Sequence, residues 1–220
     1  DLQTSRRTSS YLEFFLDMNS TTNGIGKFAK LNHNSKYRNQ MHTHERQKEQ
    51  ISLNGVRYIE NIDLKWVYKS TFIPPKKKFI LVVPGGSLKR KNKRIPTKIF
   101  ERLISFFLID KFEVLLIGGK DDVDTCRKIK SKFPSVVNLC NQTTINDLGK
   151  LSKYSTLSIG NDTGPMHVIA KGGNLTFVFF TKYSNPDLCK PVGKKVFIFN
   201  YKNDQRKFYN NVKKTIQIKV

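Results

Sequence analysis

Acidic residues are scarce in this chain, because 17 Asp and Glu stand against 40 Lys and Arg and leave a formal net charge of +23 over 220 residues. Such an excess favours anionic partners such as phosphates, nucleic acids or a lipid headgroup surface. The lysines are scattered among many Asn and Ile residues, as in the product of an AT-biased genome, so both explanations of the charge stay open. The densest basic runs, residues 76–78 and 88–94, contain no interleaved aromatic residues, which argues against a surface that stacks nucleic-acid bases.

Cysteine and long apolar runs are scarce as well. Cys126, Cys140 and Cys189 form no CxxC pair and leave an odd thiol, which indicates a reducing compartment rather than a disulfide framework. No apolar run reaches the roughly 18 residues that a membrane span needs. The opening DLQTSRRTSS also lacks the apolar core of a signal peptide. We therefore expect a cytoplasmic protein without a membrane span.

Short apolar runs alternate with helical patterns from residue 76 onward. The runs predict strands at 79–84, 112–119, 135–139, 155–160, 175–180 and 195–200. Apolar spacing of three and four residues predicts helices at 96–109, 121–133, 143–154 and 164–172. Such alternation with short connections indicates an α/β fold, a Rossmann-like parallel sheet with helices on both faces. Ligands of these sheets bind outside the carboxyl ends of the strands.

The front of the chain is less regular. Helices are expected at 11–18, which has an aromatic face, and at 35–53, which is polar. Neither builds a domain alone, so residues 1–73 are predicted to be part of a second α/β domain. Residues 74–205 form the Rossmann-like domain in this interpretation, and residues 206–220 form a C-terminal tail.

The stretch SIGNDTGPMHVIAKGG, residues 158–173, joins a predicted strand to a predicted helix. Residues 161–164 form the turn, Thr163 can cap the helix, and Pro165 is expected as the first helical residue, where its missing N–H costs nothing. Gly164 lets a ligand approach the backbone. The amides of a first helical turn carry partial positive charge, so this junction suits a diphosphate.

Two side chains of this stretch add to that interpretation. His167 can donate to the same phosphate, whereas Asp162 would repel an anion and is expected to point toward a sugar hydroxyl or a neighbouring amide. An ordinary capped helix with a surface histidine explains the same residues, and physical reasoning alone leaves the two alternatives open. No DxD pair follows an apolar strand, and DDVD at 121–124 is interpreted as a helix start, so no metal site is expected.

NDTGPMHVIAKGG resembles a pattern of glycosyltransferase family 9, the ADP-heptose:lipopolysaccharide heptosyltransferases, which reads Asp-Ser/Thr-Gly-Pro-x-His before small residues and Gly. Weaker similarities stand around it in family order: DLQTSRRTS, NGIGKF, VVPGGS with KRIP, LLIGGKDDVDTCRKI and NLCNQTTINDLGKL. The resemblance covers about residues 1–200. It implies a GT-B fold, in which residues 74–205 bind the nucleotide sugar and residues 1–73 belong to the acceptor-binding half.

The resemblance also implies a reaction. A heptose-like sugar would pass from a nucleotide diphosphate sugar, ADP-heptose by default, to an anionic lipopolysaccharide core acceptor, without a metal or another cofactor. Such an enzyme would contact the inner membrane face peripherally and would bind no nucleic acid. The family's first strand and glycine-rich loop, which carry its catalytic aspartate, would precede Asp1, so the general base is expected outside these residues.

Individual roles follow from the matched motifs. The resemblance implies backbone contacts to the donor diphosphate at four positions supported by a histidine: Thr163, Gly164, Pro165, Met166 and His167. Further donor contacts are implied at Ser87 and at Asp122, with Asp124 as the alternative register. Lys93 and Asp162 are the expected catalytic residues, and Arg7 is expected near the acceptor. Two other functions stay open, a degenerate protein that binds nucleotides or glycans without turnover and a basic nucleic-acid-binding protein.

Overall fold

The computed structural model describes residues 1–220 except 4, 17–19 and 58–61. Contacts divide the described chain into two compact units, each of which is considered by itself. The first unit comprises Asp1–Ile62 with Asp187–Cys189, and the second comprises Asp63–Pro186 with Lys190–Val220. Among the described residues, no helix is long and apolar enough to cross a bilayer.

The first unit is small and has little regular structure. Its elements are α1 (Arg6–Ser10), the 3-10 helix η1 (Tyr11–Phe15), β1 (Asn23–Gly24), β2 (Leu31–Asn32) and α2 (Thr43–Ser52). The helix expected at 35–53 begins only at Thr43, after a run of turns. In place of one helix over 11–18, a 3-10 helix follows α1, and residues 17–18 lie outside the described residues.

The second unit is built on one six-stranded parallel sheet. Its strands are β3 (Phe79–Val83), β4 (Glu113–Leu116), β5 (Val137–Asn138), β6 (Leu157–Asn161), β7 (Leu175–Phe180) and β8 (Val196–Asn200). They lie in the order β5-β4-β3-β6-β7-β8. This is the Rossmann order, in which the chain first builds one half of the sheet outward from the central strand and then returns to build the other half. The predicted parallel sheet is therefore confirmed.

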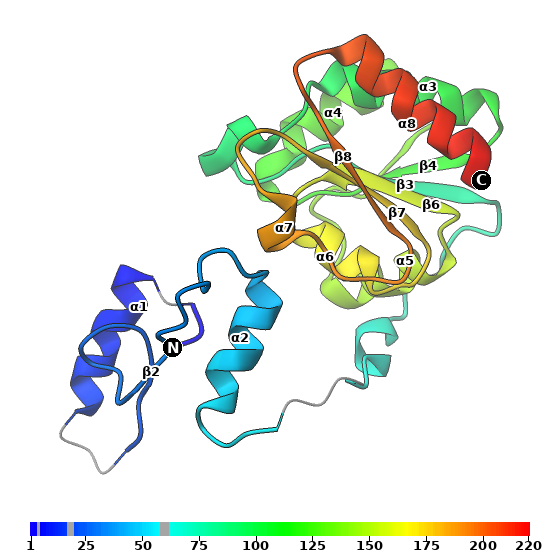
Figure 1. Cartoon of the computed structure of the whole chain (residues 1–220). Coiled ribbons are helices and arrows are strands. Elements are labelled where there is room, and N and C mark those ends of the chain that lie inside the picture. Colours follow the sequence, from blue (N-terminus) through cyan, green and yellow to red (C-terminus); the bar gives the residue numbers. More distant parts are fainter. Residues whose placement is uncertain (4, 17–19, 58–61) are drawn as a thin grey trace. The chain divides into compact units, whose positions relative to one another are not determined.

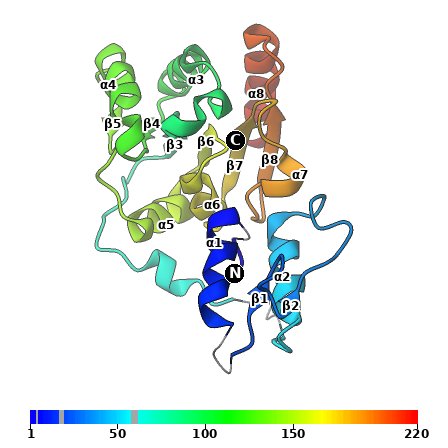
Figure 2. The ribbon, with the colours of Figure 1, turned by 90° about the vertical axis from the view of Figure 1, so that its left-hand side faces the viewer.

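Helices cover both faces of this sheet, as predicted. The α-helices of this unit are α3 (Thr97–Ile109), α4 (Val123–Lys132), α5 (Ile145–Tyr154), α6 (Gly164–Ala170) and α8 (Gln205–Lys219). The short helix α7 (Pro186–Cys189) belongs to the first unit from Asp187 onward. The 3-10 helices are η2 (Lys65–Tyr68), η3 (Leu88–Lys93) and η4 (Lys120–Asp122). Figures 1 and 2 show α3, α4 and α8 over one face and α5 and α6 over the other.

The second unit is larger than the span 74–205. Residues 206–220, expected as a tail, belong almost entirely to α8, whose apolar residues Phe208, Val212 and Ile216 are buried in the core. The Phe208 ring meets the Phe179 ring edge-on, with centroids 5.2 Å apart. At the other end, contacts place the boundary at residue 63 instead of 74.

Residues before 74 join the second unit through α5. Gly149 of α5 lies against η2, because a Cβ there would approach the carbonyl oxygen of Val67 to 2.4 Å. Ser70 also donates to the Oδ1 atom of Asp147. Asp147 closes a capping box with Thr144, whose backbone amide donates to Oδ2 over 2.8 Å.

Two of the three cysteines lie in surroundings that suppress thiol reactivity. Cys126 and Cys140 are buried in the second unit. Desolvation raises the pKa of the Cys126 thiol, and burial likewise raises the pKa of Cys140. Both thiols therefore stay protonated near neutral pH and are poor nucleophiles.

Gly160 supports the junction of β6 and α6, which gives a prediction about stability. A Cβ there would lie 2.6 Å from Met166 Sδ and 2.7 Å from Val83 Cβ. We expect Gly160→Ala to lower the free energy of unfolding by about 1–3 kcal/mol through overpacking, measured by urea denaturation. Gly164→Ala is the control, since a Cβ at Gly164 meets nothing within 4 Å. Equal losses in both variants would contradict this packing argument.

Asp147 gives a prediction about pH. The hydrogen bond from Ser70 and then those from Thr144 lower the pKa of this carboxyl below its usual value. Its contribution to stability is therefore complete above the pKa of the unfolded chain and is lost as the pH falls through the lowered value. Asp147→Asn should cost more stability at about pH 6 than at about pH 3, measured by urea midpoints. Asp124→Asn, at an exposed position, is the control, and a loss that is independent of pH would refute the assignment.

Candidate functional site

The carboxyl ends of β3 and β6 meet at the centre of the sheet. Val83 pairs with Gly160, so the loop after β3 and the turn after β6 leave the sheet side by side. The order of the strands reverses here, and such a switch point is where open α/β sheets bind ligands. The loop carries Gly85, Gly86 and Ser87, and the turn carries Asp162.

Asp162 and Lys93 form an ion pair at this point. Lys93 Nζ lies 2.7 Å from Asp162 Oδ2, and the two side chains are 20% and 5% exposed. Ser184, after β7, donates its hydroxyl to the same oxygen over 2.5 Å. The sequence expectation had Asp162 meeting a sugar hydroxyl or an amide. The structure pairs it with Lys93 and Ser184, since a buried carboxylate needs a compensating charge, and the contact with a sugar hydroxyl stays a prediction.

Asn161 holds the surrounding loops together, although the sequence analysis did not single it out. Its Nδ2 atom donates to the carbonyl oxygens of Pro84 and Gly85 over 2.8 and 3.0 Å. Its Oδ1 atom accepts from the amide of Ile95 over 3.1 Å. One buried side chain therefore ties the turn after β6 to the start of the loop after β3 and to the segment after Lys93. Asn161 directly precedes the Asp-Thr-Gly-Pro motif, and this position was the sequence signal that could have identified it.

The turn leads directly into α6, with small differences from the predicted geometry. Thr163 occupies the N-cap position, but its side chain makes no capping hydrogen bond. The helix begins at Gly164, so Pro165 is the second helical residue and not the first. Met166 is buried, and its amide donates to the Thr163 carbonyl over 3.0 Å. His167 lies on the exposed side of the helix.

Gly164 is the most open backbone position of this turn. The residue is exposed, and the space where a side chain would stand is empty to 4 Å. Ser87 is exposed too and caps η3, its hydroxyl accepting from the amide of Lys89 over 3.3 Å. The backbone of Gly164 is therefore accessible to a ligand, whereas Met166 has its side chain in the core.

Asp122 organises the neighbouring loops. Its Oδ1 atom accepts from the Gly86 amide over 2.7 Å and from Arg94 Nη2 over 3.1 Å, and its Oδ2 atom accepts from the Gly119 amide over 2.9 Å. The side chain is 7% exposed. Asp124 is exposed and pairs with Arg127, which lies on the same helix. Of the two registers left open by the sequence, Asp122 is therefore the acid at the rim.

Tight packing around Asp122 explains why residues 85 and 118 are glycines. A Cβ at Gly85 would come within 1.9 Å of Asp122 Oδ1, and one at Gly118 within 2.7 Å of Asp122 Cβ. Across the described ranges, no group of three His, Cys, Asp or Glu side chains is placed to hold a metal ion. The polar groups of this rim include the pairs Lys93–Asp162 and Arg94–Asp122, the hydroxyl of Ser184 and the amides of the turn.

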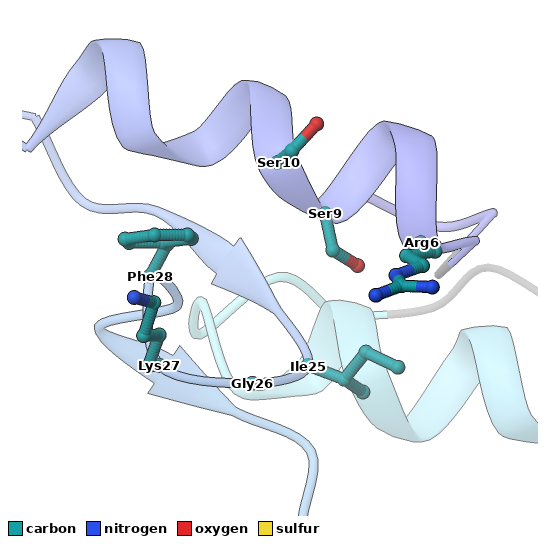
Figure 3. Close-up of a pocket in the computed structure, with 7 residues that line it drawn as sticks. All are labelled: Arg6, Ser9, Ser10, Ile25, Gly26, Lys27 and Phe28. Atoms are coloured by element: carbon teal, nitrogen blue, oxygen red, sulfur yellow. The ribbon is translucent and has the colours of Figure 1, made fainter.

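Arg7 belongs to the first unit, where it is exposed on α1. The same unit contains a cavity of about 500 Å³ that is lined by Arg6 instead, together with Ser9, Ser10, Ile25, Gly26, Lys27 and Phe28. Figure 3 shows Arg6 and Ser9 extending from α1 toward the loop that carries Ile25 and Gly26. Lys27 Nζ lies 4.5 Å from the centre of the Phe28 ring.

Known proteins resemble this chain in sequence and fold. A stretch of 116 residues is 34% identical to lipooligosaccharide heptosyltransferase 2 of Campylobacter jejuni and covers 48% of this chain and 36% of that protein. E. coli heptosyltransferase WaaC with ADP superposes with a TM-score of 0.69 at 17% identity, over 88% of this chain and 61% of its own. A glycosyl transferase of family 9 from Veillonella parvula gives 0.66 at 18% identity, over 100% of this chain and 65% of its own.

Two conclusions follow from these similarities. The chain spans about a third of the length of the curated relatives it matches. Residues 27–217 match the model of glycosyltransferase family 9 (heptosyltransferase), a span that includes the whole switch-point site. The structural neighbours share the fold, and the chain belongs to glycosyltransferase family 9.

Proposed function

We propose that this chain supplies the donor-binding part of a sugar transferase. The protein would move a heptose-like sugar from a nucleotide diphosphate sugar, with ADP-heptose as the first candidate, to a lipopolysaccharide core acceptor. The observation that carries this proposal is the Lys93–Asp162 pair at the switch point of a family 9 fold. The proposal is also supported by the names of two neighbours, heptosyltransferases solved with ADP and with a fluorinated ADP-heptose.

On the donor side of the reaction, the proposed chemistry depends on cations more than on a general base. Sugar transfer develops negative charge on the leaving diphosphate, and groups that are already in place stabilise it best. An ammonium has three donors. Lys93 can therefore keep its bond to Asp162 and also donate to a phosphate oxygen. The backbone amides of Thr163 and Gly164 and the side chain of His167 would add further donors, whereas Pro165 has no N–H and would contact the diphosphate through other backbone atoms. We propose that no metal is required.

The acceptor belongs to the other part of the proposal. We propose that Arg7 and its unit contact an anionic lipopolysaccharide-like acceptor, and that the protein works in the cytoplasm, peripherally at the inner membrane face. The net charge of +23 supports an anionic acceptor and surface. Ser87 is proposed to contact the donor through its exposed hydroxyl, and Asp122 to act on the donor through the loops it holds.

The donor class is tested by nucleotide binding. In a thermal-shift screen of the chain against ADP, UDP and GDP and their sugars, ADP compounds should raise the melting temperature most. Lys93→Ala should weaken ADP binding about tenfold or more, because a charge-assisted hydrogen bond is lost, measured by calorimetry. Lys128→Ala, an exposed lysine on α4, is the matched control. Absence of binding by every nucleotide would overturn the proposal.

The loop-holding role of Asp122 gives a separate prediction. Asp122→Ala leaves Arg94, which is 17% exposed, without its carboxylate and leaves two loop amides without an acceptor. We expect a loss of about 3–5 kcal/mol in unfolding free energy, as for other broken buried pairs, and weaker ADP binding in the variant that remains folded. Asp124→Ala should stay within about 0.5 kcal/mol of the parent chain. Urea denaturation decides, and similar losses in the two variants would be inconsistent with this role.

A further inference from the structure

The turn that follows β7 contacts Asp162 of the Lys93–Asp162 pair and the residue that directly precedes Lys93. β7 ends at Phe180, and Thr181 to Ser184 form a turn closed by a 3.1 Å hydrogen bond from the Ser184 amide to the Thr181 carbonyl. β7 lies beside β6, with Phe179 opposite Asn161, so this turn leaves the sheet at the same rim. Neither hydroxyl of the turn belongs to a motif that is recognisable in the sequence.

Ser184 acts on the carboxylate. Its hydroxyl donates to Asp162 Oδ2 over 2.5 Å, and Lys93 Nζ reaches the same oxygen at 2.7 Å. Hydrogen bonds to an ionised acceptor are shorter and stronger than neutral ones. Two donors that approach one oxygen from different segments restrict the rotation of the carboxylate more than either donor alone.

Thr181 acts on the segment that carries the lysine. Its hydroxyl donates to the carbonyl oxygen of Asn92 over 2.8 Å, and Asn92 directly precedes Lys93 in η3. Thr181 is 9% exposed, so this bond is shielded from water. One turn of four residues therefore holds the backbone beside Lys93 and the side chain of Asp162.

Because packing around the turn is incomplete, much of the restraint on the Lys93–Asp162 pair comes from the two hydroxyl groups. Thr181 and Ser184 also border a cavity of about 510 Å³, whose other side includes Asn200, Tyr201 and Lys202. Packing against protein is therefore incomplete on the cavity side of the turn. The two side-chain hydrogen bonds supply directional restraint that packing on one side does not.

We propose that Thr181 and Ser184 are positioning residues for the Lys93–Asp162 pair. They hold the ammonium and the carboxylate in the arrangement that receives the donor diphosphate, and they do so before the ligand arrives. This role rests on the proposed function, because it assigns the pair to donor binding. The hydroxyls themselves need not touch the donor.

The first test needs no ligand. Hydrogen–deuterium exchange of the full chain should be faster over residues 88–94 in Thr181→Val and over 161–164 in Ser184→Ala, because the local restraint is lost. Thr181→Ser and Ser184→Thr, which keep a hydroxyl, should restore slow exchange. Ser131→Ala is the matched control, since it also removes one hydroxyl bond, the 2.9 Å bond to the Lys128 carbonyl. Unchanged exchange in both site variants would overturn the proposal.

The second test separates positioning from general stabilisation. Ser184→Ala should weaken ADP binding by about five- to tenfold, the effect of losing one hydrogen bond of ordinary strength. In an Asp162→Asn background the same change should have almost no effect, because Ser184 acts through that carboxylate. An undiminished loss in that background would refute the role. If the parent chain binds no ADP, the proposed function fails, and the exchange experiment alone then decides whether the turn positions the pair.

Discussion

Three polar side chains are buried where β3 and β6 end, and the need to pair each of them shapes this half of the molecule. Asp122, Asn161 and Asp162 are each less than a tenth exposed. A buried polar group without a partner costs several kcal/mol, roughly as much as a good hydrophobic contact contributes. Their partners come from loops distant in sequence, above all the segment from Gly86 to Ile95. The loops of the rim are therefore held by polar contacts, whereas the sheet beneath them is held by its apolar core.

The site itself is close to electrically balanced, in contrast to the chain as a whole. Lys93 and Arg94 are adjacent in sequence, yet each pairs with a different buried carboxylate, Asp162 and Asp122. Long-range attraction by the basic surface can raise the local concentration of an anion, but it does not select a geometry. Selection at this rim depends on directed donors that are already in place, and this is how electrostatic preorganisation differs from net charge.

Most of the second unit could be predicted from sequence because its strands are buried on both faces. FILVV and LTFVFF read as continuous apolar runs, and β3 and β7 match them closely. The helix at 205–219 was missed, although Phe208, Val212 and Ile216 recur at helical spacing, because nine of its 15 residues carry charged or amide side chains and the segment reads as a polar tail. Residues 35–53 gave the opposite error, because the predicted helix was too long. Their polar residues are compatible with a helix over the whole range, and only tertiary contacts confine it to Thr43–Ser52.

The sequence by itself determined the alternation of strands and helices, the strand-to-helix junction at Asp162–Gly164 and the likeness to family 9, because these depend on local periodicity and on a contiguous motif. Only the tertiary structure decided which carboxylate meets which cation, that Asp122 rather than Asp124 reaches the rim, and that Ser184 shares an oxygen with Lys93. Such pairings join residues up to 69 positions apart, and their geometry is set by the order of strands in the sheet and by the burial of the groups involved. The order of the strands is a property of the folded sheet and cannot be read from a local stretch of sequence.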